Sequence, residues 1–314
     1  MHNISDKFHS FRDGNPLGSF FLLIFFVFCG LFIGQLIGLG LVMLFFNFGI
    51  SALQDVILDA ADHPEAKLPM YILQGCTAIG AFIVAPLLFM NIWVKRSASI
   101  FFLNRPISST ILVVTFFIVI SFMFVNSLFV EWNAQLTLPE FLKPFEDWAY
   151  EKEQQAKLLT EFLTQFDNFA QFLLGVLIIA VIPAIGEELL FRGLIQNQMH
   201  GISKNIHVAI WVTGFLFSAM HLQFYGLIPR MLLGVLFGYM YYWSGNLLVP
   251  IIAHFINNAF TLTMLYLFQL KTIDYDLETE TSVPWYTALV CLVAGTVLLI
   301  YFKRNFRESR IIDG

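Results

Sequence analysis

Long apolar runs separated by short polar segments dominate the chain. A helix needs about 20 mainly apolar residues to cross the hydrocarbon core of a bilayer. Eight runs approach or exceed this length, so the pattern predicts an all-α polytopic membrane bundle of about eight transmembrane helices. The predicted spans are Gly18 to Phe48, Leu68 to Val94, Ile107 to Val130, Phe169 through Gly186, Ile206 to Phe224, Leu227 to Trp243, Leu247 to Leu270, and Pro284 to Phe302.

A polar stretch of 36 residues, Asn133 to Asn168, separates the third and fourth predicted spans and carries seven acidic and three basic residues. It is too polar to cross a bilayer. Apolar residues recur within it at helical spacing, at Leu158, Leu159, Phe162, Leu163 and Phe166. This spacing predicts an amphipathic helix that lies on the membrane surface between spans three and four. An ordinary interfacial connector is favoured over a substrate gate.

Composition indicates the same environment. Hydrophobic residues make up 58% of the 314 positions and charged residues 12%. This leaves too little polar surface to cover a soluble globule, so membrane lipid is a predicted partner. No basic patch predicts nucleic-acid binding. The cysteines Cys29, Cys76 and Cys291 lie in apolar runs without disulfide or metal-ligand spacing.

The placement of lysine and arginine indicates orientation. With eight spans and the N-terminus inside, the predicted cytoplasmic segments hold the larger share of basic residues, including Lys95, Arg96 and the C-terminal tail. We therefore expect both termini in the cytoplasm and the protein in the plasma (inner) membrane of a bacterium. The oligomeric state stays open, because Gly30, Gly34 and Gly38 could pack helices within one chain or between two.

Ionisable side chains inside membrane spans mark candidate functional positions, because each costs at least ~2.5 to 3.5 kcal/mol to bury. Three of them interrupt the fourth predicted span, one falls late in the fifth, and one falls in the seventh with an asparagine one turn later. These residues are Glu187, Glu188, Arg192, His221, His254 and Asn258.

Spacing separates the roles of the two adjacent glutamates. Glu188 and Arg192 are four residues apart with the acid first, the favourable order for a helical ion pair. Adjacent helix positions point about 100° apart, so Glu187 can face a cavity while Glu188 is paired. The alternative interpretation is a structural polar cluster between helices, without chemistry.

The helical hairpin brings a histidine to the depth of Glu187. Counted from the turn near residues 201–205, Glu187 and His221 lie at similar depths in adjacent helices. Phe217 shares a helical face with His221, and Asn258 shares one with His254. A carboxylate and an imidazole can activate water, and polar donors can stabilise an oxyanion. The set therefore favours amide hydrolysis. No Gly-x-Ser-x-Gly elbow, His-Glu-x-x-His helix, phosphate loop or dinucleotide fingerprint points elsewhere.

Three segments resemble the motifs of one protein family. They are GEELLFRG at 186–193, the Phe217-x-x-x-His221 pair, and NLLVPIIAHFINN at 246–258. In order and spacing they are similar to the CAAX prenyl endopeptidase and bacteriocin-processing (CPBP) family of intramembrane proteases. We therefore expect N-terminal spans and the polar connector at 1–168, a CAAX-protease-like catalytic core at 169–270, and a last span with a basic tail at 271–314.

The resemblance implies roles for the motif residues. Glu187 would activate water with His221, while His254 and Asn258 would stabilise the oxyanion. Glu188, Arg192 and Phe217 would support the site. The family has been described both as metalloproteases and as glutamate-dependent proteases. If zinc is bound, Glu187, His221 and His254 are the expected ligands; a metal-free site is favoured.

Two rival functions stay open alongside the peptidase. A non-hydrolytic immunity or scaffolding protein could bind a membrane-associated peptide in the same cavity. A small transporter could use intramembrane carboxylates and histidines as a proton relay, although no inverted repeat supports this. The expected substrate of the peptidase is a membrane-associated peptide or protein, and the sequence shows no prenyl pocket.

Overall fold

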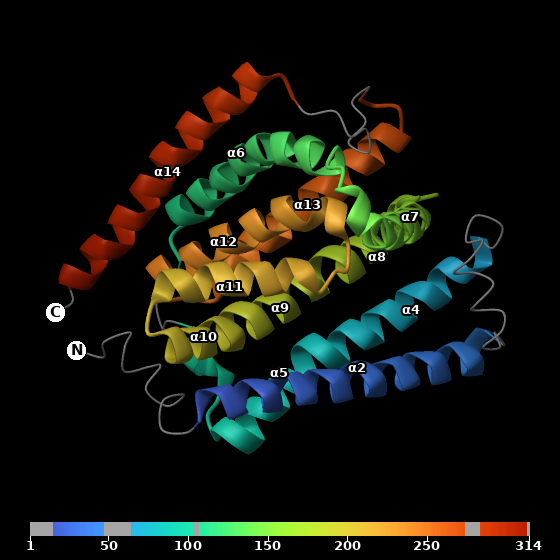
Figure 1. The fold of residues 1–314 in the computed structure, drawn as a ribbon, viewed down its shortest axis with the longest axis horizontal. Helices are drawn as coiled ribbons and strands as arrows, with labels where there is room; N and C mark the ends of the chain where they lie inside the picture. Colours follow the sequence, from blue (N-terminus) through green and yellow to red (C-terminus); the bar gives the residue numbers. More distant parts are fainter. Residues whose placement is uncertain (1–14, 47–63, 103–106, 274–282, 313–314) are drawn as a thin grey trace.

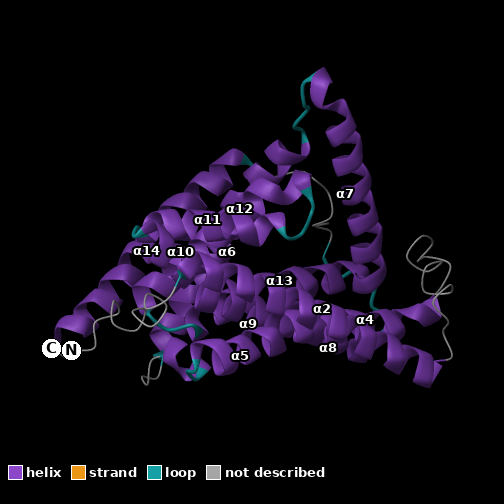
Figure 2. Ribbon diagram, turned by 60° about the horizontal axis from the view of Figure 1, so that its bottom comes forward, coloured by secondary structure: helices purple, strands orange, loops and turns teal. Residues whose placement is uncertain are grey.

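A computed structural model describes residues 15–46, 64–102, 107–273 and 283–312 of the chain. All regular secondary structure in these ranges is helical, which confirms the predicted all-α fold (Figures 1 and 2). The main helices are α2 (Pro16–Phe46), α4 (Lys67–Ala78), α5 (Ala85–Phe89), α6 (Ser109–Ala134), α7 (Lys143–Thr164), α8 (Phe169–Gly175), α9 (Ile182–Glu188), α10 (Gln196–Ser203), α11 (Ile206–Ala219), α12 (Leu227–Ser244), α13 (Leu248–Gln269) and α14 (Trp285–Ile312).

Short wider-wound segments join several of these helices into longer rods, and short 3₁₀ turns lie at connections. The π-helical segments are η4 (Ile79–Val84), η5 (Met90–Val94), η8 (Val176–Val181) and η9 (Leu189–Ile195). The 3₁₀ turns are η3 (Pro64–Ala66), η6 (Ala98–Phe101), η7 (Glu140–Leu142) and η10 (Phe224–Gly226).

Seven described helices are long and apolar enough to cross a membrane, and α11 is a shorter apolar helix of 14 residues. The chain is thus an integral membrane protein with close to the predicted eight spans. In Figure 1, α11 lies alongside α12 and counts as an eighth crossing of the bundle. With an even number of crossings, α2 begins and α14 ends at the same end of the bundle. Which side of the membrane this end faces stays a prediction.

Two boundaries differ from those expected. The fifth span was predicted to reach Phe224, but α11 ends at Ala219, because Leu222 adopts the left-handed conformation (φ 55°) and the helix cannot continue through it. The fourth span extends beyond its predicted end at Gly186: the helical rod runs over 169–203 and contains the predicted helical ion pair of Glu188 and Arg192.

The polar connector contains the predicted helix. In α7, Phe162 and Leu163 are buried against the bundle, while the opposite face is exposed. Ahead of it the backbone N–H of Leu138 donates to the Glu146 carboxylate at 3.0 Å, which holds the pKa of Glu146 below its usual range. That α7 lies on the membrane surface remains a prediction.

The glycines of α2 pack within the chain. A side chain at Gly30 would collide with the backbone of Gly80, and one at Gly34 with that of Cys76, so α2 and the rod that begins with α4 approach backbone to backbone. Inside the bundle, α12 is the spanning helix with the largest buried share, and it packs against α6, α11, α13 and α14. The predicted site residues lie between the α8–α10 rod, α11, α12 and α13.

Candidate active site

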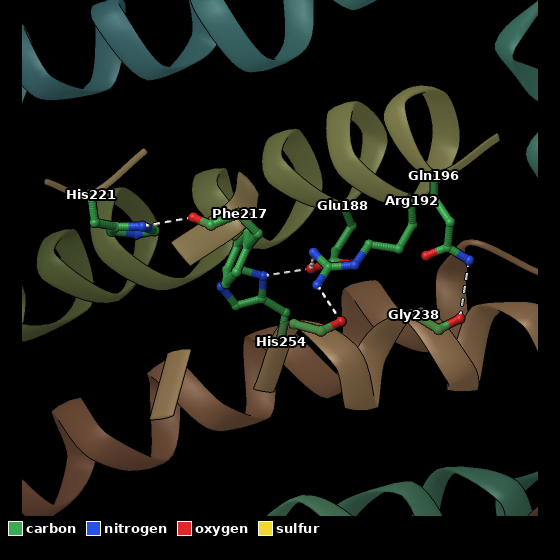
Figure 3. A network of polar contacts seen from close by, with 8 residues as sticks. Glu188, Arg192, Gln196, Phe217, His221, Gly238 and His254 are labelled. Carbon is green, nitrogen blue, oxygen red and sulfur yellow. Dashed lines mark hydrogen bonds and ion pairs between the residues drawn. The ribbon is translucent and has the colours of Figure 1, made fainter. Parts of the chain in front are cut away.

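A buried ion pair lies at the centre of the site. Arg192 Nη1 donates to Glu188 Oε1 at 2.7 Å, and both side chains are fully buried (Figure 3). The predicted pair is therefore present. The guanidinium also donates through Nη2 to the Gly234 carbonyl at 2.9 Å. It lies 4.7 Å from the centroid of the Phe217 ring, where the negative face of the ring attracts a cation.

Glycines of α12 make these backbone contacts possible. Gly234 lies against Gly214 of α11 and leaves room for the Arg192 side chain. One turn further along both helices, Gln196 Nε2 donates to the Gly238 carbonyl at 3.2 Å (Figure 3). Residues four apart share a helical face. A polar stripe on the α8–α10 rod is thus matched by carbonyls at small residues of α12.

His254 joins the ion pair from α13. Its Nδ1 lies 2.9 Å from Glu188 Oε1, and its ring packs against Phe217 and Phe237. A carboxylate paired with arginine accepts hydrogen bonds, so Nδ1 of His254 carries the proton. In the neutral imidazole, Nε2 then presents a lone pair. As an imidazolium, His254 would donate from both nitrogens.

Glu187 differs from its neighbour. It is buried, with 8% of its surface exposed, yet it forms no hydrogen bond or ion pair with a residue that the structure describes. It interacts electrostatically with His254, Glu188 and Arg192. Gly186, directly before it, lies against Phe82 of η4, which holds this turn of α9 tightly in the bundle. The backbone at Glu187 is therefore fixed by packing, but its carboxylate has no hydrogen-bond partner among the described residues, whereas Glu188 next to it is in an ion pair with Arg192.

His221 lies in the turn after α11, not within the helix as expected. Its Nδ1–H donates to the Phe217 carbonyl at 3.0 Å (Figure 3). A carbonyl can only accept, so Nε2 of the neutral ring bears the free lone pair. The ring also lies edge-on to the Phe217 ring, with centroids 5.5 Å apart. Phe217 thus contacts Arg192, His221 and His254, while no hydrogen bond joins His221 directly to Glu187.

Asn258 closes a gap that a proline creates. Pro183 has no N–H, so the carbonyl of Ile179, four residues before it, lacks its helical donor. Asn258 Nδ2 donates to this carbonyl at 3.1 Å. Its Oδ1 accepts from Asn257 Nδ2 at 3.0 Å. One amide hydrogen of Asn258 remains for another acceptor. The structure therefore ties α13 to the rod that carries Glu187.

The expected zinc ligands do not form a ligand set. No group of three or more histidine, cysteine, aspartate or glutamate side chains in the described part of the chain is arranged to hold a metal ion. Glu187, His221 and His254 are therefore not assembled as the three ligands of a zinc site. Metal dependence stays a prediction.

Several contacts of the site were missed from the sequence. Gln196 continues the spacing of Glu188 and Arg192 by one further turn, and Gly234 and Gly238 are also four apart. This matched spacing on two neighbouring helices was the available signal. Asn257 offered none, because adjacent asparagines do not indicate which one orients the other.

Comparisons with known proteins show which part of the chain carries the resemblance. Residues 169–260 match the family described as type II CAAX prenyl endopeptidase Rce1-like. The chain is also 33% identical over 88 residues to Uncharacterized protein YpbD of Bacillus subtilis (strain 168), which covers 27% of this chain and 42% of that protein. The chain thus spans less than half the length of this curated relative. No solved structure matches this chain.

The matched segment runs from the start of α8 into α13, and all the motif residues singled out above fall within it. The helices α2 to α7 and α14 lie outside. The predicted resemblance is therefore confirmed: over residues 169–260, this chain is similar to the Rce1-like type II CAAX prenyl endopeptidases.

Proposed function

We propose that the protein is an intramembrane endopeptidase that hydrolyses a peptide bond of a membrane-associated protein or peptide. One observation carries the proposal: Glu187 is a buried carboxylate without a hydrogen-bond partner in the described chain, although Glu188 beside it binds Arg192 and His254 through Oε1. A carboxylate held in this way can accept a proton from water. The family match of the same segment supports the assignment.

In the proposed reaction, Glu187 accepts a proton from a water molecule, whose oxygen adds to the scissile carbonyl carbon. The free Nε2 of His221 accepts the second hydrogen bond of that water and orients it, which its Nδ1–H contact with Phe217 makes possible. The buried ion pair of Glu188 and Arg192 lies nearby and is already in place before the reaction, so the site needs little reorganisation.

The carbonyl oxygen becomes negatively charged as water adds. The remaining amide hydrogen of Asn258 can donate to it, and His254 can do so when it is protonated on Nε2. The proton taken by Glu187 then passes to the leaving nitrogen, and the carbon–nitrogen bond breaks. The products are a carboxylic acid, which keeps the second proton of the water, and an amine; proton transfer between them gives a carboxylate and an ammonium, and the charge on Glu187 is restored.

Hydrolysis in isotopically labelled water tests the proposal. Purified protein in lipid vesicles would be given membrane-associated peptides in H₂¹⁸O, including matched sets with and without a prenylated CAAX terminus, because the family's name refers to that substrate. We expect fragments whose new carboxylate carries one ¹⁸O atom. Peptides that bind and are recovered intact, without fragments, would instead indicate the non-hydrolytic function.

Removal of metal should leave this cleavage unchanged. The reason is that Glu187, His221 and His254 are not arranged as a zinc ligand set. The fragments would be quantified before and after dialysis against a chelator, with metal content measured on the same samples. Cleavage that is lost on chelation and restored by one equivalent of zinc would contradict this expectation.

A further inference from the structure

The loop that carries His221 is held in place by residues far away in the sequence. It joins α11 to α12, contains the left-handed Leu222, and ends in the short turn η10. His221 precedes Leu222 directly and is no longer part of α11. Its position therefore depends on what fastens the loop, beyond its own contact with Phe217.

Helix α7 fastens the loop at two points. Gln223 Nε2 donates to Glu153 Oε1 at 3.0 Å. The ring of Phe224 meets the ring of Phe145 edge-on, with centroids 5.6 Å apart. Both α7 residues lie outside the segment that matches the peptidase family. The site therefore depends on a helix that the family comparison does not cover.

Helix α7 is itself held firmly at its far end. The hydroxyl of Tyr71 on α4 donates to the Leu163 carbonyl. From α13, Gln269 Nε2 donates to the Thr164 carbonyl at 2.9 Å. Because α7 is one continuous helix between these contacts and the loop, it can transmit this fixed position to the loop.

A positive charge lies against the same loop, because Arg230 Nη1 donates to the Gln223 carbonyl at 3.5 Å. Arg230, in the first turns of α12, packs against Gly226 and interacts electrostatically with both Glu153 and His221. Arg230 forms no ion pair with a residue in the described ranges. A second carboxylate oxygen, Glu153 Oε2, is buried without a hydrogen-bond partner. Glu153 thus accepts a hydrogen bond from the loop at Gln223 and also supplies a negative charge that attracts Arg230.

We propose that Glu153 is a positioning residue for His221, acting through Gln223 and Arg230 from the polar connector between the third and fourth spans. Its catalytic consequence rests on the proposed peptidase function, whereas the placement of His221 does not. The polar connector then contributes to the site, because it fixes the position of the loop that carries His221.

The test measures the placement of His221 both by activity and by chemical reactivity. Glu153→Ala and Gln223→Ala should each lower kcat roughly tenfold with little change in KM, because a displaced base loses alignment with bound substrate. The double variant should be no worse than Glu153→Ala, since Glu153→Ala already removes the hydrogen bond that Gln223→Ala removes. Glu153→Gln keeps an acceptor for Gln223, so retained activity would assign the effect to the hydrogen bond. Activity as low as that of Glu153→Ala would assign it to the charge opposite Arg230.

A matched control lies on the same helix. Glu151 is exposed and, among the described residues, accepts from Gln155 in the next turn of α7 and not from the loop, so Glu151→Ala should leave kcat unchanged. Carbethoxylation by diethyl pyrocarbonate, read out by mass spectrometry, reports the accessibility of His221 without any assay of cleavage. We expect faster modification of His221 in Glu153→Ala and Gln223→Ala. The rate at the exposed His207, at the other end of α11, should stay constant.

The outcomes separate the two proposals. If the wild-type protein cleaves no peptide but His221 modification still rises in Glu153→Ala, the peptidase proposal fails and the positioning proposal stands. Unchanged modification and unchanged kcat in Glu153→Ala would overturn the positioning proposal. A rise at His207 equal to that at His221 would also overturn it, because this would indicate general loosening of the bundle.

Discussion

Replacement of Glu187 by glutamine is expected to abolish peptide hydrolysis while the protein remains folded. Glutamine has the same shape but its amide cannot accept a proton from water, and loss of a general base costs roughly 10²- to 10⁴-fold in rate. The fold should tolerate the change, because Glu187 makes no hydrogen bond or ion pair within the described chain that the amide would break. The measurements are kcat on a cleaved peptide and thermal unfolding in detergent.

Glu188→Gln is the matched control for this prediction, because it makes the same chemical change at the adjacent position. There the carboxylate accepts from Arg192 and His254, so we expect lower stability as well as lower activity. A Glu187→Gln protein that cleaves peptides at the wild-type rate would remove the physical basis of the proposed function. A Glu187→Gln protein that fails to fold would assign this residue to the structural cluster instead.

The features that follow from local spacing could be predicted from the sequence. The apolar runs predicted the spans, because bilayer thickness fixes the length of a crossing helix. The four-residue spacing of Glu188 and Arg192 predicted their ion pair, because that spacing alone brings the side chains together. The free carboxylate of Glu187 followed from the same geometry.

Features that depend on contacts between distant segments could not be predicted. Nothing near His254 in the sequence indicates that its ring would bind Glu188, since this contact needs the packing of α13 against α9. The end of α11 at Ala219 depends on the left-handed Leu222, a conformation that no local residue type signals. Likewise, Asn258 reaches the carbonyl freed by Pro183 only through the folded bundle.

Replacement of Arg192 by methionine is expected to destabilise the protein severely. Methionine fills similar space but leaves Glu188 as a buried carboxylate without its cation. Removing one partner of a buried pair typically costs about 3 to 5 kcal/mol. The Gly234 carbonyl would lose its donor as well. We expect low yield from membranes and a much lower midpoint of unfolding in detergent.

Two further variants determine whether the buried charge is the cause. Glu188→Leu combined with Arg192→Met removes both charges, and we expect it to be more stable than Arg192→Met alone, because no unpaired charge remains. Arg192→Lys keeps the charge but not the planar group that reaches Glu188 and Gly234 together, so its stability should fall between wild type and Arg192→Met. If the double variant were less stable than Arg192→Met, the carboxylate that accepts from His254 would contribute more to stability than the unpaired charge costs. In that case the main role of Glu188 would be to hold His254 on α13 against the α8–α10 rod, and the ion pair with Arg192 would be secondary.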